Sequence, residues 1–188
     1  MNCLYHDFER WKVKRFVKDA RDLHQIKIFI KDNFARLKEV RMGIIAASGD
    51  PPQMKFNQFL KFCLLAKMHD KHVTSSMLES SFAAANYDAD TDSWNDSTAL
   101  LRYEFFEVLV RIARRKYIEN GELEDDESYR ALHRLVNIHI LPILQHNKLP
   151  EWQPFRDNLL WKREVHEFFY ENQGCIRGVY KLILGLRG

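Results

Sequence analysis

Apolar residues recur along most of the chain at spacings of three and four, which is the period of an amphipathic helix. A short first segment and a longer second one show this spacing, at Leu4, Phe8 and Trp11 and then at Ile26, Ile30, Phe34, Leu37 and Ile44. Seven glycines and five prolines in 188 residues are too few for the many tight turns of an all-β fold. The pattern therefore predicts an all-α protein with long helices.

The helix expected to be most deeply buried lies in the middle of the chain. Apolar residues cover it nearly all round, at Leu101, Phe105, Phe106, Val108, Leu109, Val110 and Ile112. A later helix is expected to begin after the acidic residues 125–127 and to end or kink near Pro142. Residues 148–154 are typical of a linker, and the last amphipathic stretch should break at Gly174.

Composition narrows the class of protein. A hydrophobic content of 46% is ample for a buried core, and no run of eighteen apolar residues predicts a membrane span. The three cysteines, Cys3, Cys63 and Cys175, are widely spaced and lack a CxxC pair, so the chain offers neither a disulfide framework nor a zinc site. We therefore expect a soluble cytoplasmic protein from a reducing compartment.

Charge is distributed unevenly along the chain. Residues 1–45 hold eleven Lys or Arg against six acids, whereas residues 86–96 hold four aspartates and residues 119–127 hold six acids, with no base in either stretch. A basic end of this kind can bind an acidic protein surface, nucleic acid or anionic lipid, and a solvated helix face is the plainer alternative. Nucleic-acid binding is not expected, because no known motif accompanies the charge.

The stretch from Met77 to Tyr117 has the layout helix, acidic loop, helix. Oxygen-bearing residues alternate from Asn86, as they do at the start of a calcium-binding EF-hand loop. Counting from Asn86, however, Thr91 stands where a turn glycine is needed and Ser97 where a bidentate acid is needed, and Glu104 comes seven residues late. The expected site is vestigial and comprises Asn86, Asp88, Asp90, Asp92 and Glu104.

A second copy of this layout spans residues 35–68. If Met54 is the apolar residue at mid-loop, Gln58 takes the position of the bidentate acid, and the loop before it offers too few oxygens for calcium. EF-hand loops pair through their mid-loop apolar residues, so we expect at most a short β-bridge between Met54 and Leu100. Two unrelated helical hairpins with polar loops are the alternative.

These two units, followed by the motif RYEFFEVLVRIARRKY, make the chain resemble degenerate, calmodulin-like EF-hand proteins of protist cilia and flagella. The resemblance implies a basic N-terminal helical segment at residues 1–23, an EF-hand-like pair at residues 24–118 and a helical extension at residues 119–188. It also implies a structural or adaptor role in the cytoskeleton, with tubulin or an axonemal protein as partner.

Enzymatic chemistry is not expected. The chain has no GxGxxG, GxxxxGK[ST], GxSxG or HExxH motif, and Cys63 lies in an apolar run where a thiol packs as a small hydrophobe. His69 and His72 flank a carboxylate, but they fall between two expected helices, where a solvated loop is the simpler interpretation.

Two functions remain open. The first is a calcium-independent adaptor that holds an amphipathic partner helix in an apolar groove. The second is a calcium sensor that has one weak site and exposes its groove when calcium binds. Large aromatic and apolar side chains dominate protein contacts, and the expected partner-binding residues are Trp11, Phe59, Phe62, Phe105, Leu109 and Trp161.

Overall fold

The computed structural model describes residues 2–46, 54–87, 98–145 and 162–183. The chain divides into two units, Met1–Pro150 and Glu151–Gly188, and the division falls within the linker expected at residues 148–154. Most of the described residues are helical and only four lie in strands, so the expected all-α class is confirmed. Within the described ranges, no helix combines the length and the apolarity needed to cross a membrane.

The first unit begins with the helices that lead into the first loop. They are α1 (Asn2–Arg10), the 3₁₀ turn η1 (Val13–Arg15), α2 (Ala20–Asp32) and α3 (Phe34–Ala46). The long helix expected from Ile26 to Ile44 is interrupted between α2 and α3. Asn33 leaves the helical conformation there, and its side-chain amide donates a hydrogen bond to the carbonyl of Phe29 (3.0 Å). A polar side chain that hydrogen-bonds a nearby backbone carbonyl in this way competes with the hydrogen bonds that would continue the helix.

Two short strands join the two helix-loop-helix units. Strand β1 (Met54–Lys55) leads into α4 (Phe56–Leu65), and β2 (Ala99–Leu100) follows α5 (Ser75–Asn86) and leads into α6 (Arg102–Tyr117). The strands are antiparallel, with Met54 opposite Leu100 and Lys55 opposite Ala99. The expected bridge between Met54 and Leu100 is thus confirmed, and it ties together segments that are far apart in the sequence.

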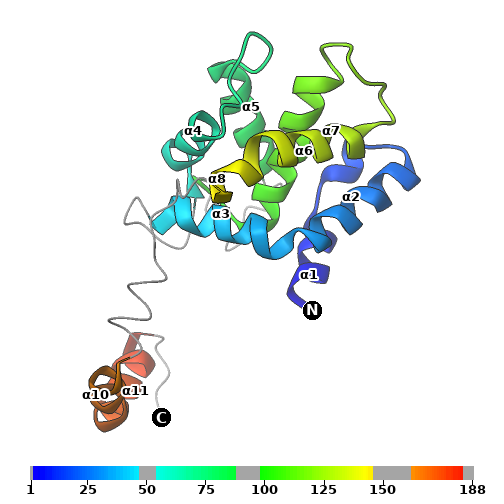
Figure 1. The fold of residues 1–188 in the computed structure, drawn as a ribbon. Helices are drawn as coiled ribbons and strands as arrows, with labels where there is room; N and C mark the ends of the chain where they lie inside the picture. Colours follow the sequence, from blue (N-terminus) through cyan, green and yellow to red (C-terminus); the bar gives the residue numbers. More distant parts are fainter. Residues whose placement is uncertain (1, 47–53, 88–97, 146–161, 184–188) are drawn as a thin grey trace. The chain divides into compact units, whose positions relative to one another are not determined.

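Helix α6 is the centre of the core, as expected from its apolar surface. Phe105, Phe106, Val108, Leu109 and Val110 are all fully buried. In Figure 1, α6 runs through the middle of the first unit, where it packs against α5 and α7. This helix therefore fixes the relative positions of the elements that surround it.

The last three helical elements of the first unit follow one another directly, with no loop between them. They are α7 (Ser128–Leu135), one π-helical turn η2 (Val136–Ile140) and α8 (Leu141–Gln145). The irregularity expected near Pro142 takes the form of this wide turn, directly before the helix that contains the proline. At the end of this turn the N–H of Leu141 bonds the carbonyl of Val136, five residues back, and the next residue, Pro142, has no N–H to donate.

The N-terminus of α7 is capped by a residue from α2. The buried carboxylate of Asp22 accepts hydrogen bonds from the backbone N–H groups of Ser128 (2.9 Å) and Tyr129 (2.7 Å). The acidic residues 125–127 were expected to mark this helix start, but the cap comes from a residue far away in the sequence. Asp22 therefore fastens the extension to the N-terminal helices.

The second unit contains α10 (Arg163–Glu171) and α11 (Gln173–Ile183). The break expected at Gly174 occurs at Asn172, which caps the C-terminus of α10.

Candidate functional site

The exits of the two loops are built alike. The N–H of Lys55 donates to the side-chain oxygen of Gln58 (2.7 Å), and the N–H of Leu101 donates to the carboxylate of Glu104 (2.8 Å). Gln58 and Glu104 are both buried, and each lies four residues after a member of the Met54–Leu100 pair. Measured from the paired strands, Glu104 therefore occupies the position in its unit that Gln58 occupies in the other.

A buried cation lies beside the exit of the second loop. Arg41, on α3, is 6% exposed and donates a hydrogen bond from Nη2 to the carbonyl of Leu100 (3.1 Å). Burial lowers the pKa of Arg41 to about 10, with Arg102 adding to the effect while the negative charges of Asp7 and Glu104 oppose it. Arg41 is therefore still charged at neutral pH, and its charge acts on the carboxylate of Glu104.

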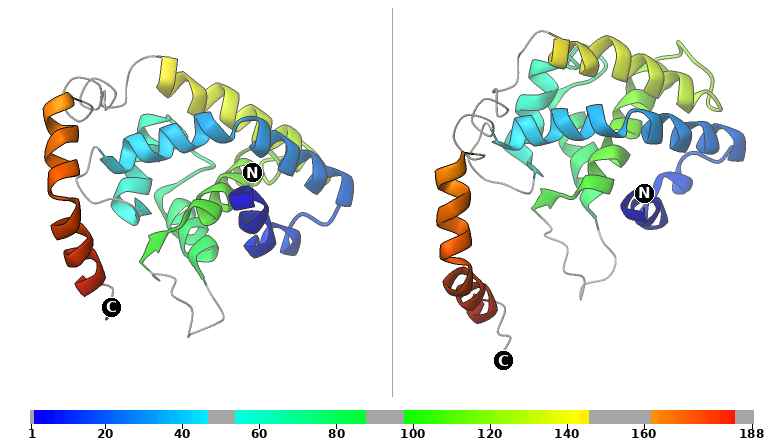
Figure 2. Two further views of the ribbon diagram at one scale, coloured as in Figure 1. Left: turned by 90° about the horizontal axis from the view of Figure 1, so that it is seen from below. Right: turned by 60° about the horizontal axis from the view of Figure 1, so that its bottom comes forward.

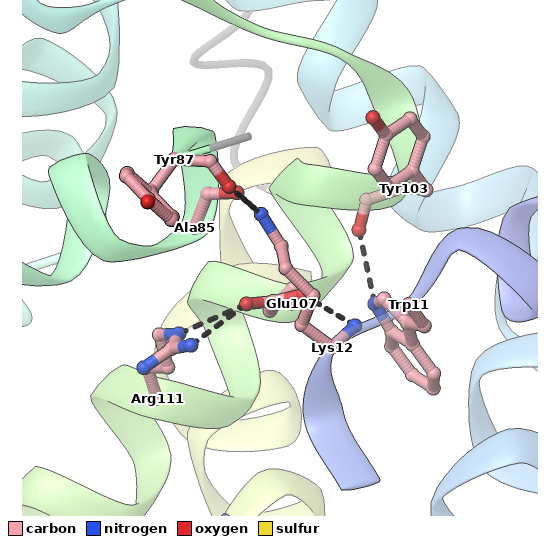
Figure 3. Close-up of polar contacts among 7 residues, drawn as sticks. All are labelled: Trp11, Lys12, Ala85, Tyr87, Tyr103, Glu107 and Arg111. Atoms are coloured by element: carbon pink, nitrogen blue, oxygen red, sulfur yellow. Dashed lines mark hydrogen bonds and ion pairs between the residues drawn. The ribbon is translucent and has the colours of Figure 1, made fainter. Parts of the chain in front are cut away.

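A second cation lies at the entrance of the same loop. The ammonium group of Lys12 donates hydrogen bonds to the carbonyls of Ala85 (2.9 Å) and Tyr87, at the C-terminal end of α5 (Figure 3). The last carbonyls of a helix lack partners within the helix and carry the negative end of its dipole. Lys12 thus supplies positive charge beside Asn86, where a calcium-binding loop would begin.

Trp11 and Lys12 also hold the N-terminal segment on α6. The indole N–H of Trp11 donates to the carbonyl of Tyr103 (3.0 Å), and the backbone N–H of Lys12 donates to the carboxylate of Glu107 (2.9 Å). Glu107 is fully buried and also accepts two hydrogen bonds from Arg111 (2.9 and 3.1 Å). We call this set of contacts, centred on Trp11, Lys12 and Glu107, the N-terminal clamp.

The structure describes only two of the five residues of the expected metal site. Asn86 is buried at the end of α5, and Glu104 is buried at the start of α6 as a helix cap. Asp88, Asp90 and Asp92 lie outside the described residues. In the part of the chain that the structure describes, no three His, Cys, Asp or Glu side chains are grouped closely enough to hold a metal ion.

The expected apolar groove is not an open surface in this structure. Phe59, Phe62, Phe105 and Leu109 are fully buried, and Trp11 is 4% exposed. The chain's own α7 packs on α6, and α8 packs on α3, so these residues contribute to the core and to the N-terminal clamp instead of facing solvent. Trp161 lies outside the described residues.

The structure instead has an open cavity of about 330 Å³ between the end of α4 and the η2–α8 segment. Its lining is mostly apolar and comprises Leu65, Ala66, Lys67, Ile138, His139, Pro142 and Ile143. Ile138, one of the lining residues, is 57% exposed. The cavity can therefore accept an apolar side chain from outside.

Irregular backbone forms two walls of this cavity. Lys67 has a positive φ of 50°, which is uncommon for a residue with a side chain, and His139 lies on the π turn. Nδ1 of His139 donates to the carbonyl of Ala66 (3.1 Å). Burial lowers the pKa of His139, although this hydrogen bond opposes the shift. No local sequence signal marks the cavity, because its walls are far apart in the chain; the hydrogen-bonded pair Ala66 and His139 is separated by 73 positions.

The segment between α4 and α5 is held by an ion pair. Asp70 pairs with Lys116 of α6 and accepts hydrogen bonds from the N–H groups of His72 and Val73 (both 2.8 Å). Burial alone would raise the pKa of Asp70, but these donors outweigh it and lower the pKa to about 2. The carboxylate between His69 and His72 thus fastens the connection to the core and is not part of a metal cluster among the described residues.

Comparison of the chain with protein-family models, with curated proteins and with solved structures gives no significant match.

Proposed function

We propose that the chain is a non-catalytic adaptor whose EF-hand-like pair keeps its shape without calcium. The observation that supports this is the placement of Lys12 and Arg41 at the two ends of the second loop. A calcium ion would supply positive charge between these ends. Here the side-chain amine of Lys12 donates a hydrogen bond at the end of α5. The guanidinium of Arg41 donates to the carbonyl of Leu100, just before α6, and attracts the carboxylate of Glu104.

The adaptor is proposed to bind an acidic surface of a cytoskeletal assembly, with the axonemal microtubule as the specific partner. The choice of partner rests on the resemblance to ciliary EF-hand-like proteins. The physical support is an exposed basic segment that we define as Lys14, Arg15, Lys18 and Arg21, with Asp19 as the one acid in that stretch. Two of the six acids of residues 1–45, Asp7 and Asp22, are buried and bonded within the chain.

A partner helix is proposed to insert an apolar side chain into the cavity beside α4. The cavity is open and mostly apolar, and Ile138 in its lining is 57% exposed. Such a contact resembles the way amphipathic helices dock through a few anchor residues. It takes the place of the groove expected from the sequence, because the chain itself buries those groove residues that the structure describes.

Co-sedimentation of the full chain with polymerised microtubules tests the proposal. Lys14→Gln combined with Lys18→Gln removes two exposed charges of the basic segment, and Lys61→Gln combined with Lys71→Gln removes two exposed charges elsewhere. The first pair should weaken binding severalfold, whereas the matched control pair should not. Attraction between exposed charges is screened by salt, so binding should fall in part between low and physiological ionic strength.

Calcium serves as the second arm of the same assay. The bound fraction should be equal in excess calcium and in excess chelator, because the proposed surface does not depend on a filled site. Retention of the chain in the supernatant at low salt would exclude tubulin as a direct partner. Binding that requires calcium would contradict the calcium-independent adaptor and favour a calcium sensor.

A further inference from the structure

The backbone at Lys67 has a conformation that favours glycine over any residue with a side chain. Its φ of 50° lies in the left-handed region, at the point where α4 ends. The N–H of Lys67 donates to the carbonyl of Leu64 (3.0 Å), and the N–H of Met68 donates to the carbonyl of Cys63 (3.0 Å). This pair of hydrogen bonds commonly ends a helix with glycine at the position of Lys67. Residues held in such a conformation are concentrated at ligand-binding sites, which directs attention to the lysine side chain.

Lys67 belongs to the lining of the open cavity of about 330 Å³ between the end of α4 and the η2–α8 segment. Figure 2 shows α7, η2 and α8 running along α2 and α3, which brings α8 beside α4. The other lining residues are apolar except His139, and burial lowers the pKa of His139 so that it is uncharged at neutral pH. Among the described residues, Lys67 therefore supplies the one charge in the lining.

The walls of the cavity are also positive. Helix α4 with the turn after it, η2 and α8 contain no Asp or Glu, whereas α4 and its turn contain Lys61 and Lys67. The next acid along the chain, Asp70, forms an ion pair with the buried Lys116. Lys67 is exposed and has no ion pair with any residue that the structure describes. An apolar cavity with such a cation complements an apolar group that has negative charge beside it.

We propose that the cavity binds an acidic amphipathic helix, which places an apolar side chain in the cavity and a carboxylate one turn away against Lys67. The inference rests on the proposed function, in which a partner helix inserts an apolar side chain at this site, and it names the chemistry of that helix. Residues three and four apart lie on the same face of a helix, so an Asp or Glu at that spacing faces the same surface as the apolar anchor. The apolar contact holds the helix, and the charge selects which helices bind. This helix is distinct from the microtubule surface proposed for the basic segment.

Selection from a displayed library of helical peptides with one randomised face tests the chemistry of the partner. The library is selected on the full chain, and binders that are lost on Ile138→Asn are taken as cavity ligands. This neutral substitution removes apolar surface from the lining at an exposed position without favouring either sign of peptide charge. The cavity ligands should share an apolar residue with an Asp or Glu three or four positions away. Cavity ligands without this acidic preference would overturn the inference and leave the apolar site of the proposed function standing, whereas the absence of any cavity ligand would contradict both.

The tightest peptide from this selection then measures the part played by Lys67. Lys67→Gly removes the charge and suits the backbone, so the variant should melt no lower than the wild type. Its affinity for the peptide should fall by about two- to fivefold, the range expected for an exposed ion pair, and the difference should shrink at high salt. Lys71→Gln is the matched control, because Lys71 is exposed and lies outside the lining, and it should bind the peptide like the wild type. Equal affinity of Lys67→Gly and the wild type at low salt would overturn the proposed contact.

Discussion

Replacing Lys12 by methionine isolates the contribution of the N-terminal clamp to stability. Methionine keeps an unbranched side chain but loses the ammonium group, which bonds the carbonyls of Ala85 (2.9 Å) and Tyr87. A hydrogen bond that involves a charged group is worth about 1.5–3 kcal/mol, and a cation at a helix C-terminus about 0.3–1 kcal/mol. The contact with Tyr87 is exposed, so solvent screening reduces these values, and Lys12→Met should lower the free energy of unfolding by about 1–2 kcal/mol.

Urea unfolding of the full chain measures this difference, and Lys14→Met is the control. Lys14 is an exposed lysine two residues further on, so its replacement should change the free energy of unfolding by less than about 0.5 kcal/mol. Amide hydrogen exchange provides a local readout, because the last turn of α5 should exchange faster in Lys12→Met alone. Equal destabilisation by the two substitutions, without faster exchange at the end of α5, would refute the role assigned to Lys12.

Three other substitutions examine the core, the helix cap and the pH dependence. Phe105→Ala should destabilise the chain by about 3 kcal/mol in urea unfolding, whereas Lys31→Ala on the exposed face should cost less than about 0.5 kcal/mol; equal effects would mean that the buried face is wrongly assigned. Asp22→Ala leaves the N–H groups at the start of α7 without their acceptor and should cost about 3 kcal/mol, while the exposed Asp32→Ala should be nearly neutral in the same assay. Because the pKa of Asp70 is lowered to about 2 in the folded chain from about 3.9 when unfolded, its stabilising effect is full above pH 4 and is lost as the pH falls toward 2. An acid titration of stability should therefore be flatter for Asp70→Asn, and an unchanged slope would contradict the ion pair with Lys116.

Much of the fold could be predicted from periodicity. The all-round apolar surface of α6 correctly predicted its central position, and the apolar residues at mid-loop correctly predicted the pairing of Met54 with Leu100. Element boundaries were less predictable. Asn33 and Asn172 end helices by local backbone contacts that the apolar pattern does not reveal.

The candidate site was harder to predict because its contacts are long-range. Counting from Asn86 placed Glu104 seven residues late, whereas the strand pairing places it in register with Gln58. An amphipathic pattern also does not say whether Trp11 covers its own chain or a partner, and the structure shows that it bonds Tyr103. The ion pair of Asp70 with Lys116 joins residues 46 apart, a separation at which local spacing carries no information.

Calorimetric titration of the full chain with calcium tests the central claim most directly. If Lys12 and Arg41 provide the positive charge that an ion would otherwise supply, calcium should bind with a dissociation constant weaker than about 10⁻⁵ M or release no measurable heat. A dissociation constant tighter than about 10⁻⁵ M, lost in Asp88→Ala, would show a working calcium site and would contradict the calcium-independent adaptor.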